Sequence, residues 1–276
     1  MRYVLIKFVT GAVVYAVNSS VTIRNCFFIS NKALSTGRGS AVFSLNSSIS
    51  IEYSVFYNHQ SKGNGGVIYA GQNSNVAVQG SFFESNLCIS STTKLCGLCL
   101  LQSPYLQNVV RYVILFSGSV SDGEGGVIYF DGSQGSALSV TASNFWLASA
   151  VSAAGISLVG GRNNAVHNKI VASQFSGLAA STVGGSVLLK DSNLDMELSS
   201  FINNFAVSGA SSLESYSSLV SLASNEFNFT GAPQLTLANS SNFSDSASFF
   251  DNGGSFCPLS FCTPTRIRNG QVIAPK

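Results

Sequence analysis

Two histidines and 12 acidic residues are the side chains of this 276-residue chain that could carry acid–base chemistry. Glycosidase-type sites need two carboxyl groups at a fixed separation, whereas the acidic residues here are scattered along the sequence. His59 replaces an asparagine at a repeated turn position, and His167 follows Arg162 in a loop. Neither histidine has a carboxylate partner at a matching offset in the repeat. We therefore predict no catalytic residue and no cofactor.

Charged side chains gather at the edges of the repeat. Lys62, Lys94 and Asp122 lie at one offset before successive repeat starts, which predicts a stripe along one loop edge. Their mixed signs favour a solvated turn over a carboxylate site. Lys169 and Asp195 share an outward position on neighbouring repeats, which predicts a stacked surface pair of small energetic value.

Six cysteines raise the question of metal binding and of small-residue packing. Cys26 occupies a position that holds serine in other repeats, and Cys99 aligns with small apolar residues. We interpret both as small side chains of the stack. Cys96 and Cys99 have the C-x-x-C spacing of redox and zinc sites, but no second pair and no histidine lies nearby. We predict no metal site.

The other cysteines could form two local disulfides. Cys88 and Cys96 lie in the same loop of the longest repeat, so a bond between them would close that insertion. Cys257 and Cys262 flank a short segment near the C-terminus and could form a second bond. Either disulfide would require an oxidising compartment.

The composition narrows the class of protein. Hydrophobic residues make up 45% of the chain and charged residues 9%, whereas globular domains average about 25% charged residues. This balance is typical of a large core with turns rich in Gly, Ser and Asn. The net charge of +2 comes without a basic run, so nothing supports nucleic-acid binding. No apolar stretch reaches about 18 residues, so we predict no membrane-spanning helix.

A repeat of about 28 residues must position these side chains. Its clearest copy begins with Gly65 and Gly66 and reads Gly-Gly-Val-Ile-Tyr, and the same five residues return from Gly125 and Gly126. Weaker copies begin at Gly11, Gly39, Gly97, Ala154 and Gly184. A phenylalanine follows each start by 17 to 21 residues. These phenylalanines are Phe28, Phe56, Phe83, Phe116, Phe145, Phe175 and Phe201.

Short alternating segments lie between the two landmarks, for example 21–23, 49–51 and 76–78. Alternation of period two predicts strands whose outer residues point inward. One repeat cannot bury its apolar face alone, so neighbouring repeats must stack, with their strands in parallel. The sequence therefore predicts an all-β fold, a single-stranded right-handed parallel β-helix of about seven to nine coils.

The pattern weakens after Phe201. Residues 219–229 and 235–250 are predicted as two degenerate coils, and three of the five prolines lie close to the C-terminus. Because proline interrupts strand ladders, we predict a repeat domain over 1–256 and a tail or linker over 257–276. Residues 1–17 fit either a signal peptide or a first coil. The first coil is favoured, which predicts a fragment of a longer protein.

Two tetrapeptides, Gly-Gly-Val-Ile and Phe-x-x-Asn, alternate within one coil. The first occurs at 65–68 and 125–128, and the second joins Phe28 to Asn31, Phe83 to Asn86 and Phe201 to Asn204. This alternation, over residues 11–205, resembles the repeats of the chlamydial polymorphic outer membrane proteins. The resemblance implies a β-helix that is extracellular or on the cell surface and that functions in adhesion, as in that family's surface-exposed passengers.

Three functions follow as hypotheses. The first is a non-catalytic cell-surface or secreted repeat domain, an adhesin or a structural spacer, whose partner would be a host or neighbouring cell-surface protein or glycan. The second is a carbohydrate-active β-helix enzyme, such as a pectate-lyase-like lyase or a hydrolase. The third is a phage-like fibre segment, which should trimerise through apolar outer patches. Sequons that a secreted glycoprotein could use begin at Asn18, Asn46, Asn228, Asn239 and Asn242.

Overall fold

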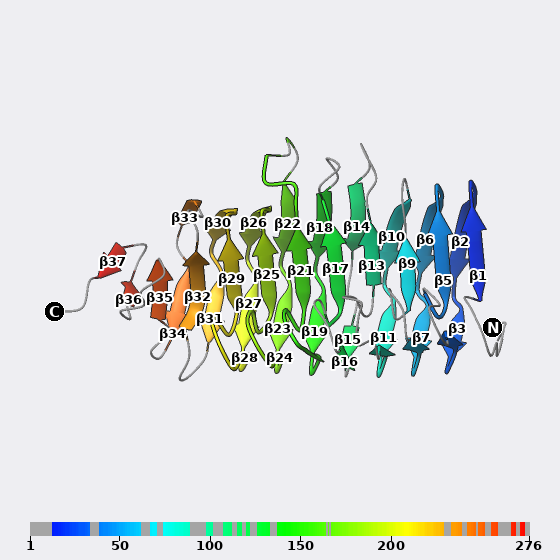
Figure 1. The fold of residues 1–276 in the computed structure, drawn as a ribbon, viewed down its shortest axis with the longest axis horizontal. Coiled ribbons are helices and arrows are strands. Elements are labelled where there is room, and N and C mark those ends of the chain that lie inside the picture. The colour runs from blue at the N-terminus through cyan, green and yellow to red at the C-terminus, as the bar shows by residue number, and fades with distance from the viewer. Residues whose placement is uncertain are drawn as a thin grey trace.

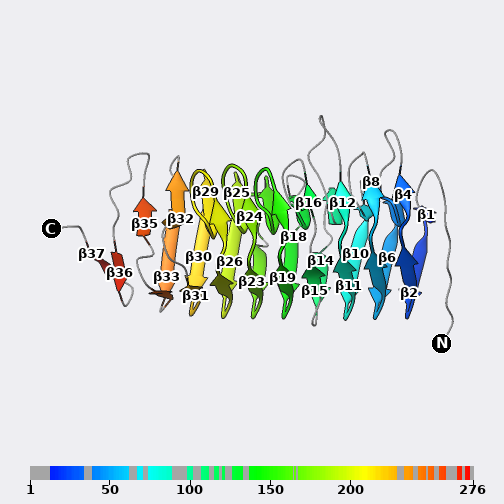
Figure 2. The ribbon, with the colours of Figure 1, turned by 90° about the horizontal axis from the view of Figure 1, so that it is seen from below.

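Parallel β-strands dominate the structure, and the residues that it describes contain no helix. The computed structural model describes residues 13–33, 39–61, 67–70, 74–88, 98–101, 107–111, 115–117, 120–121, 126–132, 137–163, 165, 167–228, 233–238, 242–246, 248–251, 255–258, 266–268 and 271–273. The strands stack along one long axis, with β1 (Val14–Val17) and β37 (Gln271–Ile273) at opposite ends (Figure 1 and Figure 2). Within these residues there is no helix long and apolar enough to span a membrane.

Two long parallel sheets form the first half of each coil. Sheet A contains β1 (Val14–Val17), β5 (Val42–Leu45), β9 (Ile68–Ala70), β13 (Leu98–Leu101), β17 (Ile128–Asp131), β21 (Ile156–Val159), β25 (Val187–Lys190), β29 (Leu213–Tyr216), β32 (Pro233–Ala238) and β35 (Ser255–Pro258). Sheet B contains β2 (Ser20–Arg24), β6 (Ser48–Glu52), β10 (Asn75–Gln79), β14 (Gln107–Arg111), β18 (Ala137–Thr141), β22 (Asn168–Val171), β26 (Asn193–Glu197), β30 (Leu219–Ala223) and β33 (Asn242–Ser246).

Two further parallel sheets complete each coil. Sheet C contains β3 (Phe27–Ile29), β7 (Val55–Tyr57), β11 (Phe82–Glu84), β15 (Leu115–Ser117), β19 (Asn144–Trp146), β23 (Gln174–Ser176), β27 (Ser200–Ile202), β31 (Glu226–Asn228) and β34 (Phe249–Asp251). The two-residue strands of sheet D are β4 (Lys32–Ala33), β8 (Gln60–Ser61), β12 (Leu87–Cys88), β16 (Val120–Ser121), β20 (Ser149–Ala150), β24 (Ala179–Ala180) and β28 (Phe205–Ala206).

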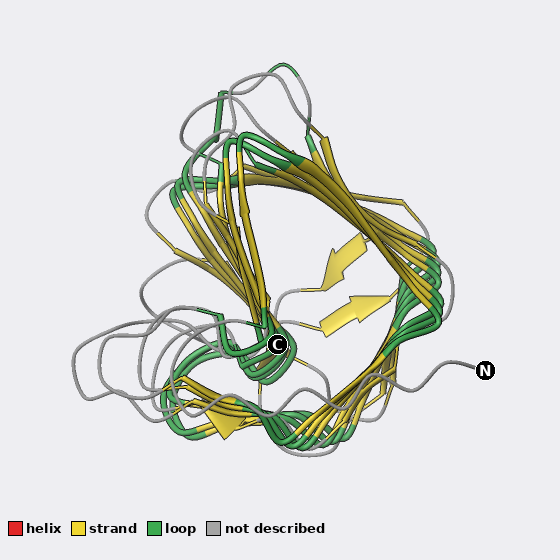
Figure 3. Cartoon of the chain, turned by 90° about the vertical axis from the view of Figure 1, so that its right-hand side faces the viewer, coloured by secondary structure: helices red, strands yellow, loops and turns green. Residues whose placement is uncertain are grey.

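The chain passes through the sheets in the order A, B, C, D and then enters the next coil. Viewed from the N-terminal end it runs clockwise as it recedes, so the coil is right-handed (Figure 3), the hand that parallel crossovers prefer. Successive strands within sheets A to D pair in parallel. The predicted fold class, a right-handed parallel β-helix, is therefore confirmed, and sheets B and C each contain nine strands.

Apolar columns fill the interior of the stack. Ile49, Ile51, Val76 and Val78 are at most 1% exposed, as the alternating segments predicted. The backbone register aligns the landmark phenylalanines in one ladder of positions on sheet C, which continues beyond Phe201 through Phe227 to position 250. Neighbouring rings of this ladder stack almost parallel, with ring centroids 4.6–4.8 Å apart in the measured pairs. That separation is the spacing between paired strands.

Serine side chains link the coils at the turn between sheets B and C. The hydroxyl of Ser54 donates to Glu52 O at 2.9 Å in its own coil and accepts the backbone N–H of Cys26 from the preceding coil at 3.2 Å. Ser173 makes the same two bonds, to Val171 O and from Ser143 N–H. Each hydroxyl thus satisfies two backbone groups that the ladder of a sheet does not reach at a corner.

The second glycine of the Gly-Gly pair is needed for close packing between coils. A Cβ added to Gly126 would lie 2.4 Å from Ala154 O of the next coil, and one on Gly185 would lie 2.0 Å from Ser211 O. Both distances are too short for any side chain, so only glycine allows the backbones to approach. Gly65, Gly66 and Gly125 lie outside the described residues.

Two coils are paired differently from the prediction. Cys99 pairs with Tyr69 and Tyr129 of sheet A, and not with the small apolar residues two positions earlier, Val67 and Val127. Ile156, rather than Ser157, occupies the position of Ile128 and Val187. The predicted positions were numbered from the glycine at the start of each repeat. The number of residues between that glycine and the strand of sheet A differs between coils, so the numbering was shifted in these two coils. The predicted column of Cys99 was therefore wrong, and its side chain lies outside the described residues.

The C-terminal strands continue the stack. Leu222 of β30 pairs with Asp245 of β33, and Phe227 of β31 with Phe250 of β34, so the predicted degenerate coils keep the register. β35 extends sheet A across the predicted end of the repeat domain. Beyond it, β36 (Arg266–Arg268) and β37 (Gln271–Ile273) pair antiparallel and lie across the end of the stack (Figure 3). Such an element can cover the open end of a solenoid.

Replacing Phe201 by alanine should lower the free energy of unfolding by about 3–5 kcal/mol, because the ring is fully buried and stacks on Phe175 and Phe227. Urea unfolding followed by circular dichroism measures this change. The control is Leu198→Ala, whose side chain is 59% exposed. Equal losses in the two variants would contradict the proposed role of the ladder.

Candidate functional site

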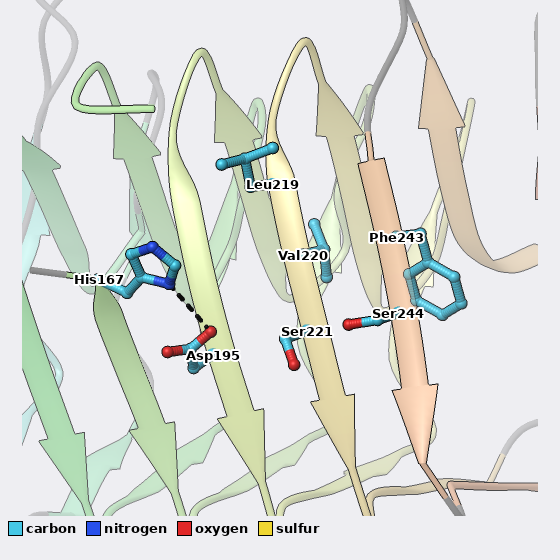
Figure 4. A pocket seen from close by; sticks show the side chains of 7 residues that line it. All are labelled: His167, Asp195, Leu219, Val220, Ser221, Phe243 and Ser244. Atoms are coloured by element: carbon cyan, nitrogen blue, oxygen red, sulfur yellow. Dashed lines mark hydrogen bonds and ion pairs between the residues drawn. The ribbon is translucent and has the colours of Figure 1, made fainter. Parts of the chain in front are cut away.

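A shallow hollow of about 240 Å³ lies on the outer face of sheet B, over its C-terminal strands. Residues from neighbouring coils line it, and Asp195, Ser221 and Ser244 form one row across three successive strands (Figure 4). The residues that line it are His167, Asp195, Leu219, Val220, Ser221, Phe243 and Ser244. Val220 is 3% exposed and Phe243 packs against the core, so the apolar lining of the hollow belongs mainly to the interior.

His167 and Asp195 form a hydrogen-bonded pair at this hollow. Nδ1 of the histidine lies 3.2 Å from Oδ1 of the aspartate, and both side chains are about 40% exposed. The sequence indicated no carboxylate at a matching offset from His167, and the partner that the structure shows lies at a different offset. His167 lies just before β22 and reaches diagonally to the next coil, whereas equal offsets identify only residues directly opposite. Lys169 is directly opposite Asp195, as predicted.

The order of the side chains decides which chemistry this row could perform. In a nucleophilic triad the histidine lies between the acid and the serine. Here Asp195 lies between His167 and Ser221, because Asp195 and Ser221 are paired on successive strands beyond the histidine (Figure 4). The imidazole is therefore not positioned to deprotonate Ser221 or Ser244.

The asparagine of Phe-x-x-Asn links coils at the turn between sheets C and D. Asn204 accepts the N–H of Leu178 at 3.0 Å and donates to Phe175 O at 3.0 Å. Asn86 makes the same two bonds, to His59 N–H and Phe56 O. The amide suits this turn because it accepts and donates at once. Asn31, in the first described coil, is buried, and its side-chain amide has no hydrogen-bond partner.

His59 occupies the same column but replaces the asparagine only in part. It is fully buried, and its Nε2 lies 3.1 Å from Phe28 O, so this nitrogen carries the proton and donates. Its Nδ1 is then an acceptor, and it has no hydrogen-bond partner. Burial lowers the pKa of His59 from 6.5 to about 4, opposed by the bond to Phe28.

Cys26 fits the serine column, as predicted. It is a free thiol whose Sγ lies 3.3 Å from Arg24 O, the counterpart of the serine bond to the residue two places earlier. The disulfides predicted between Cys88 and Cys96 and between Cys257 and Cys262 fall on side chains outside the described residues. The stripe predicted from Lys62, Lys94 and Asp122 lies outside them too.

A buried acid that the sequence did not reveal lies on sheet A. Glu214 is 2% exposed, accepts the Tyr216 hydroxyl at 2.8 Å and accepts the N–H of Ala210. Burial raises the pKa of this carboxyl, and the two hydrogen bonds oppose that rise. The side chain therefore fastens the segment before β29 to the sheet. The outward position of Glu214 on its strand predicts an exposed side chain. The side chain is buried because the segment before β29 folds over it.

The chain matches no protein-family model, no curated protein and no solved structure. Over the described residues, no group of three or more His, Cys, Asp or Glu side chains could hold a metal ion.

Replacing His59 by asparagine should stabilise the protein at pH 7 by about 1 kcal/mol, because the amide can make both bonds of its column. The lowered pKa means that the unfolded chain binds a proton that the folded chain does not. Wild-type stability from this group is therefore complete above pH 6.5 and is lost as the pH falls towards about 4. The full loss is about 3 kcal/mol.

Urea unfolding at pH 7 and pH 4.5 measures both effects. The His59→Asn variant should lose less stability between these pH values than the wild type. His167→Asn is the matched control, because that histidine is partly exposed. The same pH dependence in wild type and His59→Asn would contradict the account of the buried imidazole.

Proposed function

We propose that this chain is a rigid, non-catalytic repeat domain displayed outside the cell, where its outer faces contact other surfaces. The observation that carries this proposal is an outward column on sheet B in which serine and threonine predominate. Ala77, Val109 and the Lys169–Asp195 pair interrupt it. Thr22 and Ser50 begin it, and Ser221 and Ser244 end it, all in register. Such a flat, regularly spaced face suits repeated weak contacts, which together bind strongly.

Side chains that could take part in catalysis are used structurally in the stack, which supports the same proposal. Ser54, Ser173 and Asn204 satisfy backbone groups at the corners, and Cys26 substitutes for one of the serines. Their conformations are fixed by bonds between coils, which makes the rod stiff. The similarity of the repeat to chlamydial-type polymorphic outer membrane proteins favours an adhesive role over a spacer alone.

A carbohydrate-active enzyme is the second candidate. It is favoured by the His167–Asp195 pair, because a partly exposed histidine and carboxylate beside a hollow could act on a bound sugar. His167 and Asp195 would then act as general base or general acid, and Ser221 would not act as a nucleophile.

Two measurements test the proposal. Protease treatment of intact producing cells should remove the chain, as detected with an antibody against it, while a cytoplasmic marker survives. Resistance until the cells are lysed would contradict surface display.

Purified chain should release no reducing or unsaturated ends from pectin, xylan or glucan. Release that is lost in both His167→Ala and Asp195→Asn, but kept in the control Ser139→Ala on the same face, would establish the enzyme instead.

A further inference from the structure

A second hollow, of about 300 Å³, lies on the outer face of sheet C in the middle of the stack. It is lined by Asn144, Phe145, Trp146, Gln174 and Ser176 from two adjacent strands, β19 and β23. Asn144 pairs with Gln174 and Trp146 with Ser176, while Phe145 and Phe175 point into the core. The strand spacing places the backbones of Asn144 and Gln174 about 4.8 Å apart, and their side chains lie on the same outer face as the indole.

Trp146 is the one tryptophan of the chain, and it is 50% exposed. A half-exposed indole leaves a large apolar surface in water, which a ligand could cover. In the described part of the chain, the side chains of Asn144 and Gln174 make no hydrogen bond to protein, so their donors and acceptors face solvent. The hollow thus combines an apolar plate with amide and hydroxyl groups.

The charge of this surface identifies the class of ligand. None of the lining residues is charged. Along the same outward columns, the nearest charged residues are Glu84 and Glu226, each two coils away. A charged ligand would therefore find no ion-pair partner here. An uncharged ligand with one apolar face and several hydroxyl groups would match each group of the hollow.

We propose that the Trp146 hollow binds an uncharged glycan, with the apolar face of one pyranose ring against the indole. Asn144 and Gln174 donate to and accept from ring hydroxyls, since each amide does both, and Ser176 adds a further hydroxyl. This inference rests on the proposed function, because it names the ligand class of a displayed adhesive surface.

The apolar residues nearer the N-terminus of sheet C define the competing outcome. Ile29, Tyr57 and Phe82 are 37–42% exposed on the same outer face. A protein partner or a second copy would cover those residues and the indole together. The polar pairing of Asn144 with Gln174 favours the glycan, because an apolar partner surface would leave two amides unsatisfied.

The single tryptophan makes the experiment direct. Full-length chain is titrated with cello-, xylo-, manno- and galacto-oligosaccharides, with oligogalacturonate as the acidic comparison, and intrinsic fluorescence is recorded. At least one neutral oligosaccharide should shift the emission to shorter wavelength in a saturable manner, since the ring displaces water from the indole. Oligogalacturonate should produce no such shift.

Variants then assign the binding to the hollow. By calorimetry, Trp146→Ala should bind the active oligosaccharide roughly tenfold more weakly, and Trp146→Phe should lie between it and the wild type. Gln174→Ala should also weaken binding. Phe205→Ala is the matched control, because Phe205 is 49% exposed on sheet D, and it should bind as the wild type does. All four changes are at exposed positions, and thermal unfolding verifies that each variant folds.

Several results would overturn the inference. They are no response to any neutral oligosaccharide, a response to oligogalacturonate alone, equal loss in Phe205→Ala and Trp146→Ala, or an emission shift that depends only on protein concentration, which would identify a second copy. If the protease test shows surface display but no glycan binds, the glycan inference fails and the proposed function stands. If glycan binds but the chain is not displayed, the proposed function fails and the site stands.

Discussion

Hydrogen bonding between equivalent corners of successive coils is the constraint on which this structure depends. A strand ladder satisfies backbone groups along the sheets, but each corner turns the chain away from its neighbours. The hydroxyl of Ser54 bridges the gap by donating to its own coil and accepting from the preceding one. The amide of Asn204 bridges it by making both of its hydrogen bonds, as acceptor and as donor, to the preceding coil. These bonds hold the coils in register, and the register in turn brings the phenylalanine rings face to face at the strand spacing.

The inner columns were predictable from the sequence because stacking forces one residue type on each of them. Alternation identified Ile49 and Ile51 as buried, and the phenylalanine column identified the ladder. The origin of each coil was less predictable, since connections before sheet A vary in length while the strands do not. Counting from glycine therefore misplaced Cys99. Positions counted within a strand align reliably between coils, whereas positions counted across a loop of variable length do not.

The outer residues were harder to predict, for a different physical reason. Offsets along the repeat find residues directly opposite each other, such as Lys169 and Asp195. They do not find diagonal contacts, and His167 reaches Asp195 in that way. They also cannot predict which outward side chains a connecting segment will cover, which is why Glu214 was missed. Both misses arise from the loops, whose paths no column records.

A residue that departs from the pattern of its column has a different consequence inside the coil than on its outer surface. Inside, His59 departs from the asparagine pattern, and the result is a buried nitrogen without a partner and a lowered pKa. A ligand cannot reach that position, so the departure only weakens the stack. Outside, Trp146 replaces smaller residues along its column, where Ser117 precedes it and Ser176 follows. Packing does not require an indole there, since its neighbours maintain the same strand pairing with serine. A large aromatic side chain on a surface that the fold leaves free to vary is best explained by contact with something outside the chain.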